Sequence, residues 1–137
     1  MPEVFGDTSG LIAAFVSTET EHQKASRLMR QWNVDGTFLV TTNYILTEIV
    51  ALYVSRVRTP RALQILTIER LRESNWVETV HVTAELDLLA WQLFVSRSDK
   101  NWSLVDCTSF VLMQQRGIAS VLTSDHHFEQ AGFQILL

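Results

Sequence analysis

The sequence predicts an α/β fold: a single domain, residues 1–137, with three layers (α/β/α) and a mostly parallel central sheet. Short apolar runs alternate with longer segments of helical periodicity, which is typical of a parallel sheet covered on both faces. The composition, 47% hydrophobic and 19% charged, suits a packed core. No repeat, low-complexity tract or Pro/Gly-rich linker marks a domain boundary. One domain is therefore expected.

Five short apolar runs have the length and composition of buried strands. They are Glu3–Gly6, Thr37–Val40, Val77–Val82, Ser120–Thr123 and Phe133–Leu137. In parallel α/β sheets, ligands bind in the crevice beyond the carboxyl ends of the strands. Residues that follow these strands are therefore the first candidates for a functional site.

A helix is expected directly after the first strand, and five further segments have helical periodicity: residues 21–32, 43–57, 60–74, 84–97 and 103–117. Their ends carry recognisable signals. These are Thr18 or Thr20 before the first segment, Thr41 and Thr42 before the second, Pro60 in the first turn of the third, and Ser103 and Gly117 at the two ends of the last.

Charge and cysteine content narrow the function classes. A net charge of −4 argues against a generic nucleic-acid binder, although divalent ions bound by clustered acids would cancel part of it. The single cysteine, Cys107, excludes an internal disulfide and zinc-finger spacing, and its apolar helical neighbours predict a small, unreactive core residue. With no long apolar run and no signal-peptide pattern, we expect a soluble cytoplasmic protein without membrane contact.

Four acids are expected at one edge of the sheet. Asp7 ends the first strand, Asp125 follows the fourth, and Asp106 lies in the first turn of the last helix; Glu48 lies beside the apolar stripe of the helix after the second strand. Converging carboxylates repel one another, and a divalent cation removes that repulsion. Carboxylate oxygens favour Mg²⁺ or Mn²⁺ over zinc.

Each acid also has a purely structural interpretation. Asp7 and Asp106 are placed to cap helices, Asp125 to form a turn, and Glu48 to be a half-exposed helical acid. The sequence leaves these alternatives open for the single residues, and the combination of four favours the metal site.

Four stretches, in this order, carry a family resemblance: DTSGLIA from residue 7, TEIVAL from 47, WSLVDCTSFVLMQQRGI from 102 and LTSDHHFEQAGF from 122. Over its whole length the chain resembles PIN-domain proteins, most of all VapC-type toxins of prokaryotic toxin–antitoxin pairs. The resemblance implies a PIN-like fold and a metal-dependent endoribonuclease. Asp7, Glu48, Asp106 and Asp125 would be its catalytic, metal-binding quartet. Cys107 departs from the alanine of many relatives, a small change that leaves the role of Asp106 intact.

The resemblance also suggests supporting residues. Thr8 and Ser9 hold the hydroxyl positions after the first acid, and Asp99 is a further acid ahead of the last helix. His127 has two interpretations, a proton donor or a loop residue packed near Phe128, and the second is favoured. In the expected hydrolysis, bound metal lowers the pKa of a water and polarises the phosphate, and Glu48 holds a second ion or orders the attacking water.

Basic and aromatic residues near the acids are candidates for contact with RNA. Arg97 and Lys100 lie close in sequence to the Asp106 helix, and Trp102 is a candidate for base stacking. A second basic group, Arg56, Arg58 and Arg61, is more readily explained as solvated helix ends. Trp32 and Trp91 lie in apolar helical patterns that predict packing in the core or at a dimer interface.

Two other function classes compete with the nuclease. A phosphatase of the haloacid-dehalogenase type needs a second Asp two residues after the first, and Ser9 occupies that position. A catalytically weak PIN-like domain that acts mainly as a protein-binding module is the main alternative, although a carboxylate cluster is costly for binding alone. The resemblance further implies an RNA substrate, a small antitoxin partner and a homodimer, with residues 43–74 as one apolar contact surface.

Overall fold

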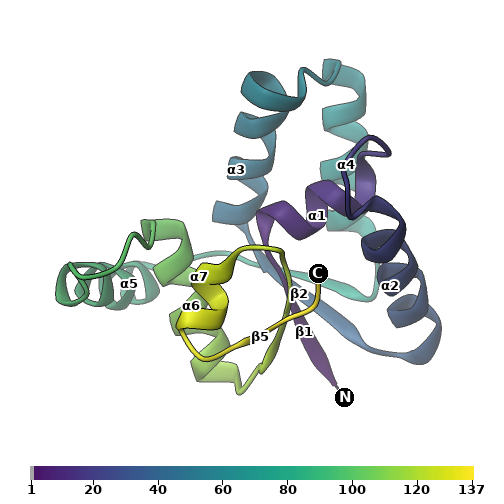
Figure 1. Cartoon of the computed structure of the whole chain (residues 1–137). Helices are drawn as coiled ribbons and strands as arrows, with labels where there is room; N and C mark the ends of the chain where they lie inside the picture. The colour runs from purple at the N-terminus through teal and green to yellow at the C-terminus, as the bar shows by residue number, and fades with distance from the viewer. Residues whose placement is uncertain (1) are drawn as a thin grey trace.

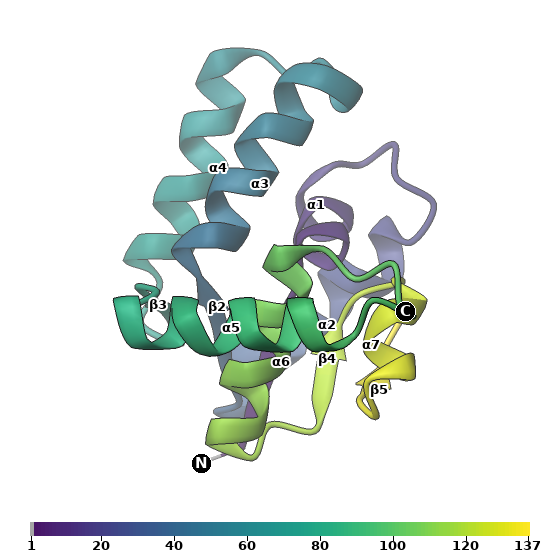
Figure 2. The same cartoon turned by 90° about the vertical axis from the view of Figure 1, so that its left-hand side faces the viewer.

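The computed structural model describes residues 2–137, and its centre is a five-stranded sheet in the order β3-β2-β1-β4-β5. All four strand pairs are parallel, which confirms the predicted α/β class. Helices α1 and α2 lie on one side of the sheet and α5 and α6 on the other, while α3 and α4 project above its upper edge (Figures 1 and 2).

The strands lie close to their predicted positions: β1 Glu3–Gly6, β2 Phe38–Thr42, β3 Val77–Val80, β4 Ser120–Leu122 and β5 Gln134–Ile135. The helices are α1 Thr8–Phe15, α2 His22–Asp35, α3 Asn43–Leu52, α4 Arg61–Glu73, α5 Ala84–Ser96, α6 Leu104–Arg116 and α7 His126–Gln130. A π-helical turn, Tyr53–Val57, extends α3.

Local signals explain most helix ends. The Thr42 hydroxyl accepts a hydrogen bond from the N–H of Ile45 and caps α3, and Gly117 ends α6 in the left-handed conformation at φ 68°. The prediction that Thr18 or Thr20 caps α2 is wrong. Glu21 precedes that helix and makes no side-chain capping bond.

Two helical segments differ from the sequence prediction. The segment expected at residues 43–57 is α-helical only to Leu52. The π-helical turn that follows ends at Val57 and is capped by Arg58, whose φ is 52°. Helix α7 was not predicted as a helix. Its five residues are too few to show helical periodicity, and its start is set by the Asp125 side chain, which accepts a hydrogen bond from the N–H of His127.

An aromatic cluster fixes α6 and α7 against the sheet. Phe110 of α6 meets Phe128 of α7 edge to face at 4.9 Å and Trp102 at 5.0 Å, and Phe128 also lies beside Phe5 of β1. All four rings are buried. Such packing holds the amino ends of both helices near the end of β1.

The order of the strands reverses at the centre of the sheet. The chain adds β2 and β3 on one side of β1 and then β4 and β5 on the other, so the order reverses between β1 and β4. Ligand sites of open α/β sheets lie beyond the carboxyl ends of strands at such a reversal. Asp7 follows β1 there, and the segment from Thr123 to Asp125 follows β4.

Among the described residues, no helix combines the length and the apolar character that crossing a membrane requires.

Candidate metal centre

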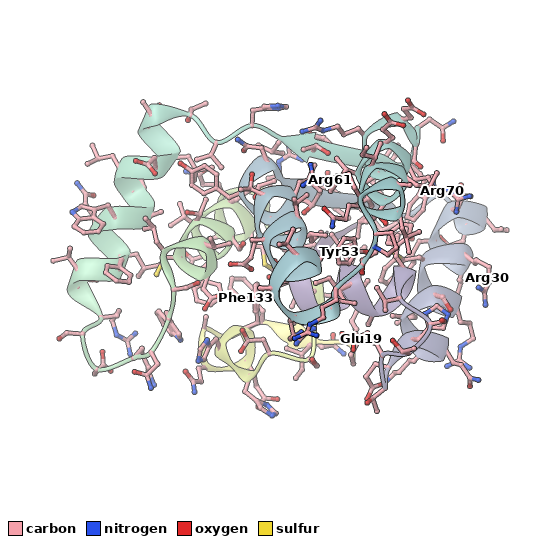
Figure 3. The ribbon with its side chains drawn as sticks, turned by 90° about the horizontal axis from the view of Figure 1, so that it is seen from above. Glu19, Arg30, Tyr53, Arg61, Arg70 and Phe133 are labelled. Atoms are coloured by element: carbon pink, nitrogen blue, oxygen red, sulfur yellow. The ribbon has the colours of Figure 1, made fainter. Side chains whose placement is uncertain are left out.

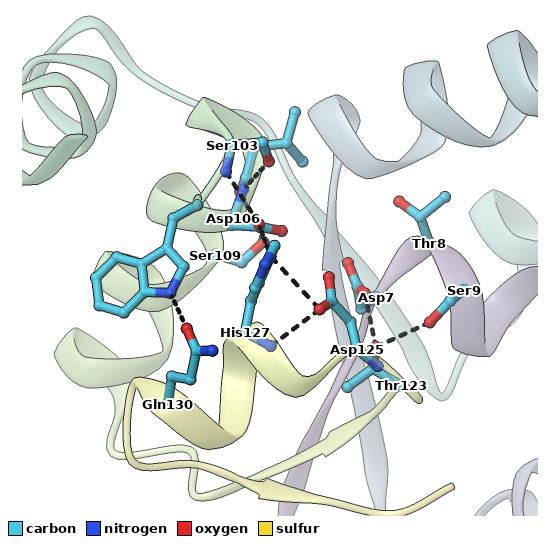
Figure 4. A network of polar contacts seen from close by, with 12 residues as sticks. Asp7, Thr8, Ser9, Ser103, Asp106, Ser109, Thr123, Asp125, His127 and Gln130 are labelled. Carbon is cyan, nitrogen blue, oxygen red and sulfur yellow. Dashed lines mark hydrogen bonds and ion pairs between the residues drawn. The ribbon is translucent and has the colours of Figure 1, made fainter. Parts of the chain in front are cut away.

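The four predicted acids come from four elements and converge above the carboxyl ends of β1 and β4. Asp7 precedes α1, Glu48 lies on α3, Asp106 in the first turn of α6, and Asp125 precedes α7. Figure 4 shows Asp7, Asp106 and Asp125 around one space. Their proximity has an electrostatic effect, because Asp106 raises the pKa of both Asp7 and Glu48.

Asp7 is the most buried of the four acids, with 4% of its surface exposed. Burial raises its pKa from 3.8 to about 7, and the nearby Asp106 and Glu48 add to the rise. The hydroxyl of Thr123 donates a 2.8 Å hydrogen bond to the Asp7 carboxylate and opposes that rise. Asp7 occupies the N-cap position of α1, but its side chain makes no capping bond, so the helix-cap interpretation does not explain it.

Glu48 is half-buried on the side of α3 that faces α1. Burial raises its pKa, and Asp106 and Asp125 add to the effect. The hydroxyl of Thr8 donates a 2.5 Å hydrogen bond to the Glu48 carboxylate. Thr8 therefore orients this acid, which agrees with the supporting role expected for it.

Asp106 and Asp125 combine a structural role with a place in the cluster. Asp106 forms a capping box with Ser103: its Oδ2 accepts from the Ser103 N–H at 3.0 Å, and its own N–H donates to the Ser103 hydroxyl at 3.0 Å. Asp125 caps α7 through the N–H of His127 at 2.9 Å. The capping interpretation of Asp106 is correct, whereas Asp125 caps a helix and does not form the expected turn. Both bonds fix the orientation of the carboxylates.

His127 contributes a nitrogen atom to the same cluster. Its Nδ1 lies 3.0 Å from Oδ2 of Asp106 and 3.4 Å from Oδ1 of Asp125. One potential ligand atom from each of these three residues fits within 4.8 Å of the others. The favoured interpretation of His127 as a loop residue is wrong, because it lies in α7 and its ring faces the acids.

Thr123 is a second residue of the site that sequence reasoning did not select. Its fully buried hydroxyl donates to Asp7, accepts from the N–H of Asp125 at 3.0 Å, and lies 2.8 Å from the Ser9 hydroxyl. The available signal was its place directly after β4, where a polar residue at the carboxyl end of a strand faces the crevice. Ser9 thus acts on the site through Thr123.

We expect Thr123→Val to lower the affinity of the site for Mn²⁺ and to move its pH dependence upward. Valine keeps the shape but removes the hydrogen bond that stabilises ionised Asp7, and it leaves the N–H of Asp125 without its acceptor, at a cost of about 1–3 kcal/mol. The measurement is Mn²⁺ titration calorimetry from pH 6 to pH 9. Thr123→Ser retains the hydroxyl and is the control; identical pH profiles for the two variants would contradict the role assigned to Thr123.

The structure places Asp99 and Trp102 differently from the prediction. Asp99 is exposed and forms a two-point ion pair with Arg97, at 2.9 and 3.0 Å, which lowers the pKa of Asp99 to about 2. It has no hydrogen bond or ion pair with the cluster. Trp102 is only 7% exposed, donates to Gln130 and is covered by Arg97 and Phe110, so its burial contradicts the expected stacking on an RNA base.

Several cavities lie outside the acid cluster. One, of about 470 Å³, is lined by Phe94, Arg97, Lys100 and Trp102, which brings the two basic candidates to one hollow next to the start of α6. Cys107 also borders it, and burial raises the pKa of its thiol to about 11, as expected for an unreactive core residue.

Another cavity, of about 530 Å³, has Arg30 and Arg70 in its lining. These residues lie on α2 and α4, away from α5 and α6 (Figure 3). Arg56 belongs to the second basic group of the sequence analysis, and it forms an ion pair with Glu19 at 2.9 Å.

The donor set of the cluster suits a divalent cation. Asp106, Asp125 and His127 bring ligand atoms within 4.8 Å of one another, and Asp7 and Glu48 lie near enough for Asp106 to raise their pKa values. No Lys or Arg of the described residues lies within ion-pair distance of any of the four acids. Without a cation, the carboxylates meet only hydroxyl and N–H donors and His127. Oxygen-rich sites of this kind hold Mg²⁺ or Mn²⁺.

Comparison with known proteins agrees with this arrangement. Residues 4–134 match the PIN domain family. The chain is 33% identical over 130 residues to the 23S rRNA-specific endonuclease VapC20 of Mycobacterium tuberculosis, in strains CDC 1551 and H37Rv, and the match covers 95% of both proteins. The crystal structure of Mycobacterium tuberculosis VapC20, described as a sarcin-ricin loop cleaving toxin, superposes with a TM-score of 0.83 at 32% identity, again over 95% of each chain.

The residues that match the family, 4–134, run from β1 to β5, so all four acids lie within the matched part of the chain. It also confirms the fold that the sequence resemblance implied. The chain belongs to the PIN-domain family and is a relative of the VapC toxins.

Proposed function

We propose that the protein is an endoribonuclease toxin that hydrolyses RNA phosphodiester bonds with Mg²⁺ or Mn²⁺ bound by Asp7, Glu48, Asp106 and Asp125. The observation that carries the proposal is the convergence of these four acids at the strand reversal of a PIN domain, where none of them pairs with a Lys or Arg among residues 2–137. Burial raises the pKa of Asp7 and Glu48, and repulsion from the neighbouring acids adds to the rise, which supports a site that binds a cation.

Each acid has a role that follows from its surroundings. Asp7 and Asp106 would hold the metal, since Thr123 orients the first carboxylate and the capping box of α6 the second. Asp125 would supply a ligand from the start of α7, where the His127 N–H orients its carboxylate. Glu48, oriented by Thr8, stands where it orders water or holds a second ion. Bound metal supplies electrophilic stabilisation of the phosphate and lowers the pKa of water.

The substrate we propose is a structured RNA, with the sarcin-ricin loop of 23S rRNA as the first candidate. The support is the 33% identity to an endonuclease of that specificity over 95% of both chains. On this chain, Arg97 and Lys100 line the cavity beside the amino end of α6 and are proposed to contact the phosphate backbone there. Arg97 is already paired with Asp99, so Lys100 is the freer of the two cations.

The proposal is tested by incubating purified protein with labelled 23S rRNA and with a pool of structured RNAs, with Mn²⁺ or with EDTA. We expect cleavage only with metal, and a loss of at least about 10³-fold in Asp106→Asn. If wild-type protein binds Mn²⁺ but cleaves no RNA, the domain is instead a protein-binding module. Cleavage that persists in EDTA would contradict the metal-dependent mechanism.

We further propose that the protein forms a homodimer and is held inactive by a small antitoxin in the cytoplasm. Two helices expose apolar side chains: Leu88, Trp91, Phe94 and Val95 on α5, and Leu63, Ile65 and Leu66 on α4. Trp91 and Phe94 stack on each other at 5.5 Å, and Trp91 is 49% exposed. Exposed apolar groups of this size mark protein interfaces. Trp32, by contrast, is a core residue.

Sedimentation equilibrium of the isolated protein tests the homodimer. We expect a dimer that Trp91→Glu converts to monomer, because an added charge opposes burial of the α5 face. A matched change at the exposed Val34 of α2, Val34→Glu, should leave the dimer intact. A monomeric wild type would reject the homodimer and leave the antitoxin as the partner of α5.

A further inference from the structure

The imidazole of His127 differs sharply from that of its neighbour His126. His127 directs Nδ1 at two acids of the metal centre, 3.0 Å from Asp106 and 3.4 Å from Asp125 (Figure 4). His126 has an 80% exposed side chain and meets only Glu129, at 3.9 Å. The two residues are adjacent on one short helix, so the chain offers a matched pair that differs mainly in contact with the acids.

The position of the His127 ring is fixed by its surroundings. The backbone N–H of His127 donates to the Asp125 side chain at 2.9 Å, and this bond caps the start of α7. The next residue, Phe128, is fully buried against Phe110 and Phe5. Helix α7 therefore cannot turn without disrupting the aromatic cluster. The ring is held at the acids by the fold and not by its hydrogen bond to Asp106 alone.

The spacing of the three groups fits a shared cation. Octahedral ions of this class have ligand atoms about 2.1 Å from the metal, so neighbouring ligand atoms lie about 3 Å apart. The separations of Nδ1 from the two carboxylate oxygens, 3.0 and 3.4 Å, are close to that value. All three atoms lie within 4.8 Å of one another.

We propose that Nδ1 of His127 is a nitrogen ligand of the metal centre and makes it prefer first-row transition ions such as Mn²⁺ over Mg²⁺. This inference rests on the proposed function, because it concerns the same metal site. Mg²⁺ is held almost entirely by oxygen, whereas imidazole is a ligand of transition-metal ions. Ligation requires the tautomer with Nδ1 unprotonated, and the ring then carries its proton on Nε2.

The test is pulsed electron paramagnetic resonance of Mn²⁺ bound to three proteins: wild type, His127→Gln and His126→Gln. We expect nitrogen coupling to Mn²⁺ in wild type and His126→Gln and its loss in His127→Gln. Competition binding on the same proteins should show Mn²⁺ affinity lower by at least about tenfold in His127→Gln, with a smaller change for Mg²⁺. Glutamine retains the backbone N–H that bonds to Asp125, so α7 remains capped.

The outcomes separate this inference from the proposed function. If Mn²⁺ binds and RNA is cut, but wild type shows no nitrogen coupling, His127 is not a ligand and only the inference is overturned. Equal losses of Mn²⁺ and Mg²⁺ affinity in His127→Gln, without nitrogen coupling in wild type, would assign it a positioning role on Asp106. If wild type binds no Mn²⁺, the metal centre itself is rejected and the proposed function fails with it.

Discussion

Asp7→Asn is expected to abolish RNA cleavage, by at least about 10³-fold, and to stabilise the metal-free protein at pH 8. The first effect follows from the loss of a proposed metal ligand. The second follows from burial: a carboxylate at this position is charged, largely excluded from water and close to two other acids. Asparagine has the same shape without the charge and keeps an oxygen that accepts the hydrogen bond from Thr123.

The pH dependence of this stabilisation has a definite sign. The pKa of Asp7 rises from 3.8 to about 7 on folding, so the folded protein holds a proton that the unfolded chain releases. The contribution of Asp7 to stability is complete below pH 3.8 and is lost as the pH rises through about 7. A rise of this size corresponds to about 4 kcal/mol at most.

Urea unfolding of wild type and Asp7→Asn in EDTA at pH 5 and pH 8 measures this effect. We expect the variant to be more stable than wild type at pH 8, by clearly more than at pH 5, where only part of the contribution of Asp7 has been lost. Asp99→Asn is a useful control, because Asp99 is exposed and paired with Arg97, and its removal should not stabilise the protein at pH 8. If Asp7→Asn is equally destabilising at both pH values, Asp7 is a structural residue and not a strained metal ligand.

Gly10→Ala is expected to destabilise the protein by about 3 kcal/mol or more and to weaken Mn²⁺ binding. A Cβ atom at Gly10 would lie 1.9 Å from the carbonyl oxygen of Leu122 and 2.4 Å from its carbonyl carbon. Both are backbone atoms of β4, so α1 and β4 must separate. That movement also separates Asp7 from Thr123, which follows β4 directly.

Gly117→Ala is the matched control for this change. No atom lies within 4 Å of a Cβ at Gly117, but its φ of 68° is left-handed, so the substitution costs only about 1–2 kcal/mol of backbone strain. It should leave Mn²⁺ affinity unchanged. Thermal unfolding and calorimetry of both variants make the comparison. A Gly10→Ala protein as stable as Gly117→Ala would show that α1 is not held against β4 as the structure describes.

The fold and the four acids could be predicted because each depends on local signals. Apolar runs and helical periodicity gave β1 with its observed bounds, and Ser103 marked the start of α6. Asp7 and Asp125 follow strands, and Asp106 lies in the first turn of a helix. The topology of a parallel sheet brings such positions together. To predict that they converge, it is enough to know at which edge of the sheet each element ends, without any side-chain contact.

The remaining features of the site depend on contacts between distant parts of the chain. Thr123 and Asp7 are 116 residues apart, and His127 reaches Asp106 only because the aromatic cluster sets α7 beside α6. Trp102 was misjudged for the same reason, since its burial is created by Phe110 and Gln130. These contacts cannot be predicted from a local pattern of polar and apolar residues.

Mn²⁺ binding by isothermal titration calorimetry, on metal-free wild type, Asp7→Asn and Asp106→Asn, tests the central claim most directly. The four acids are predicted to form one divalent metal site, so wild type should bind Mn²⁺ and each variant should lose at least about tenfold in affinity. Absence of binding by folded wild type, or equal binding by all three proteins, would contradict the claim and leave the cluster without a metal.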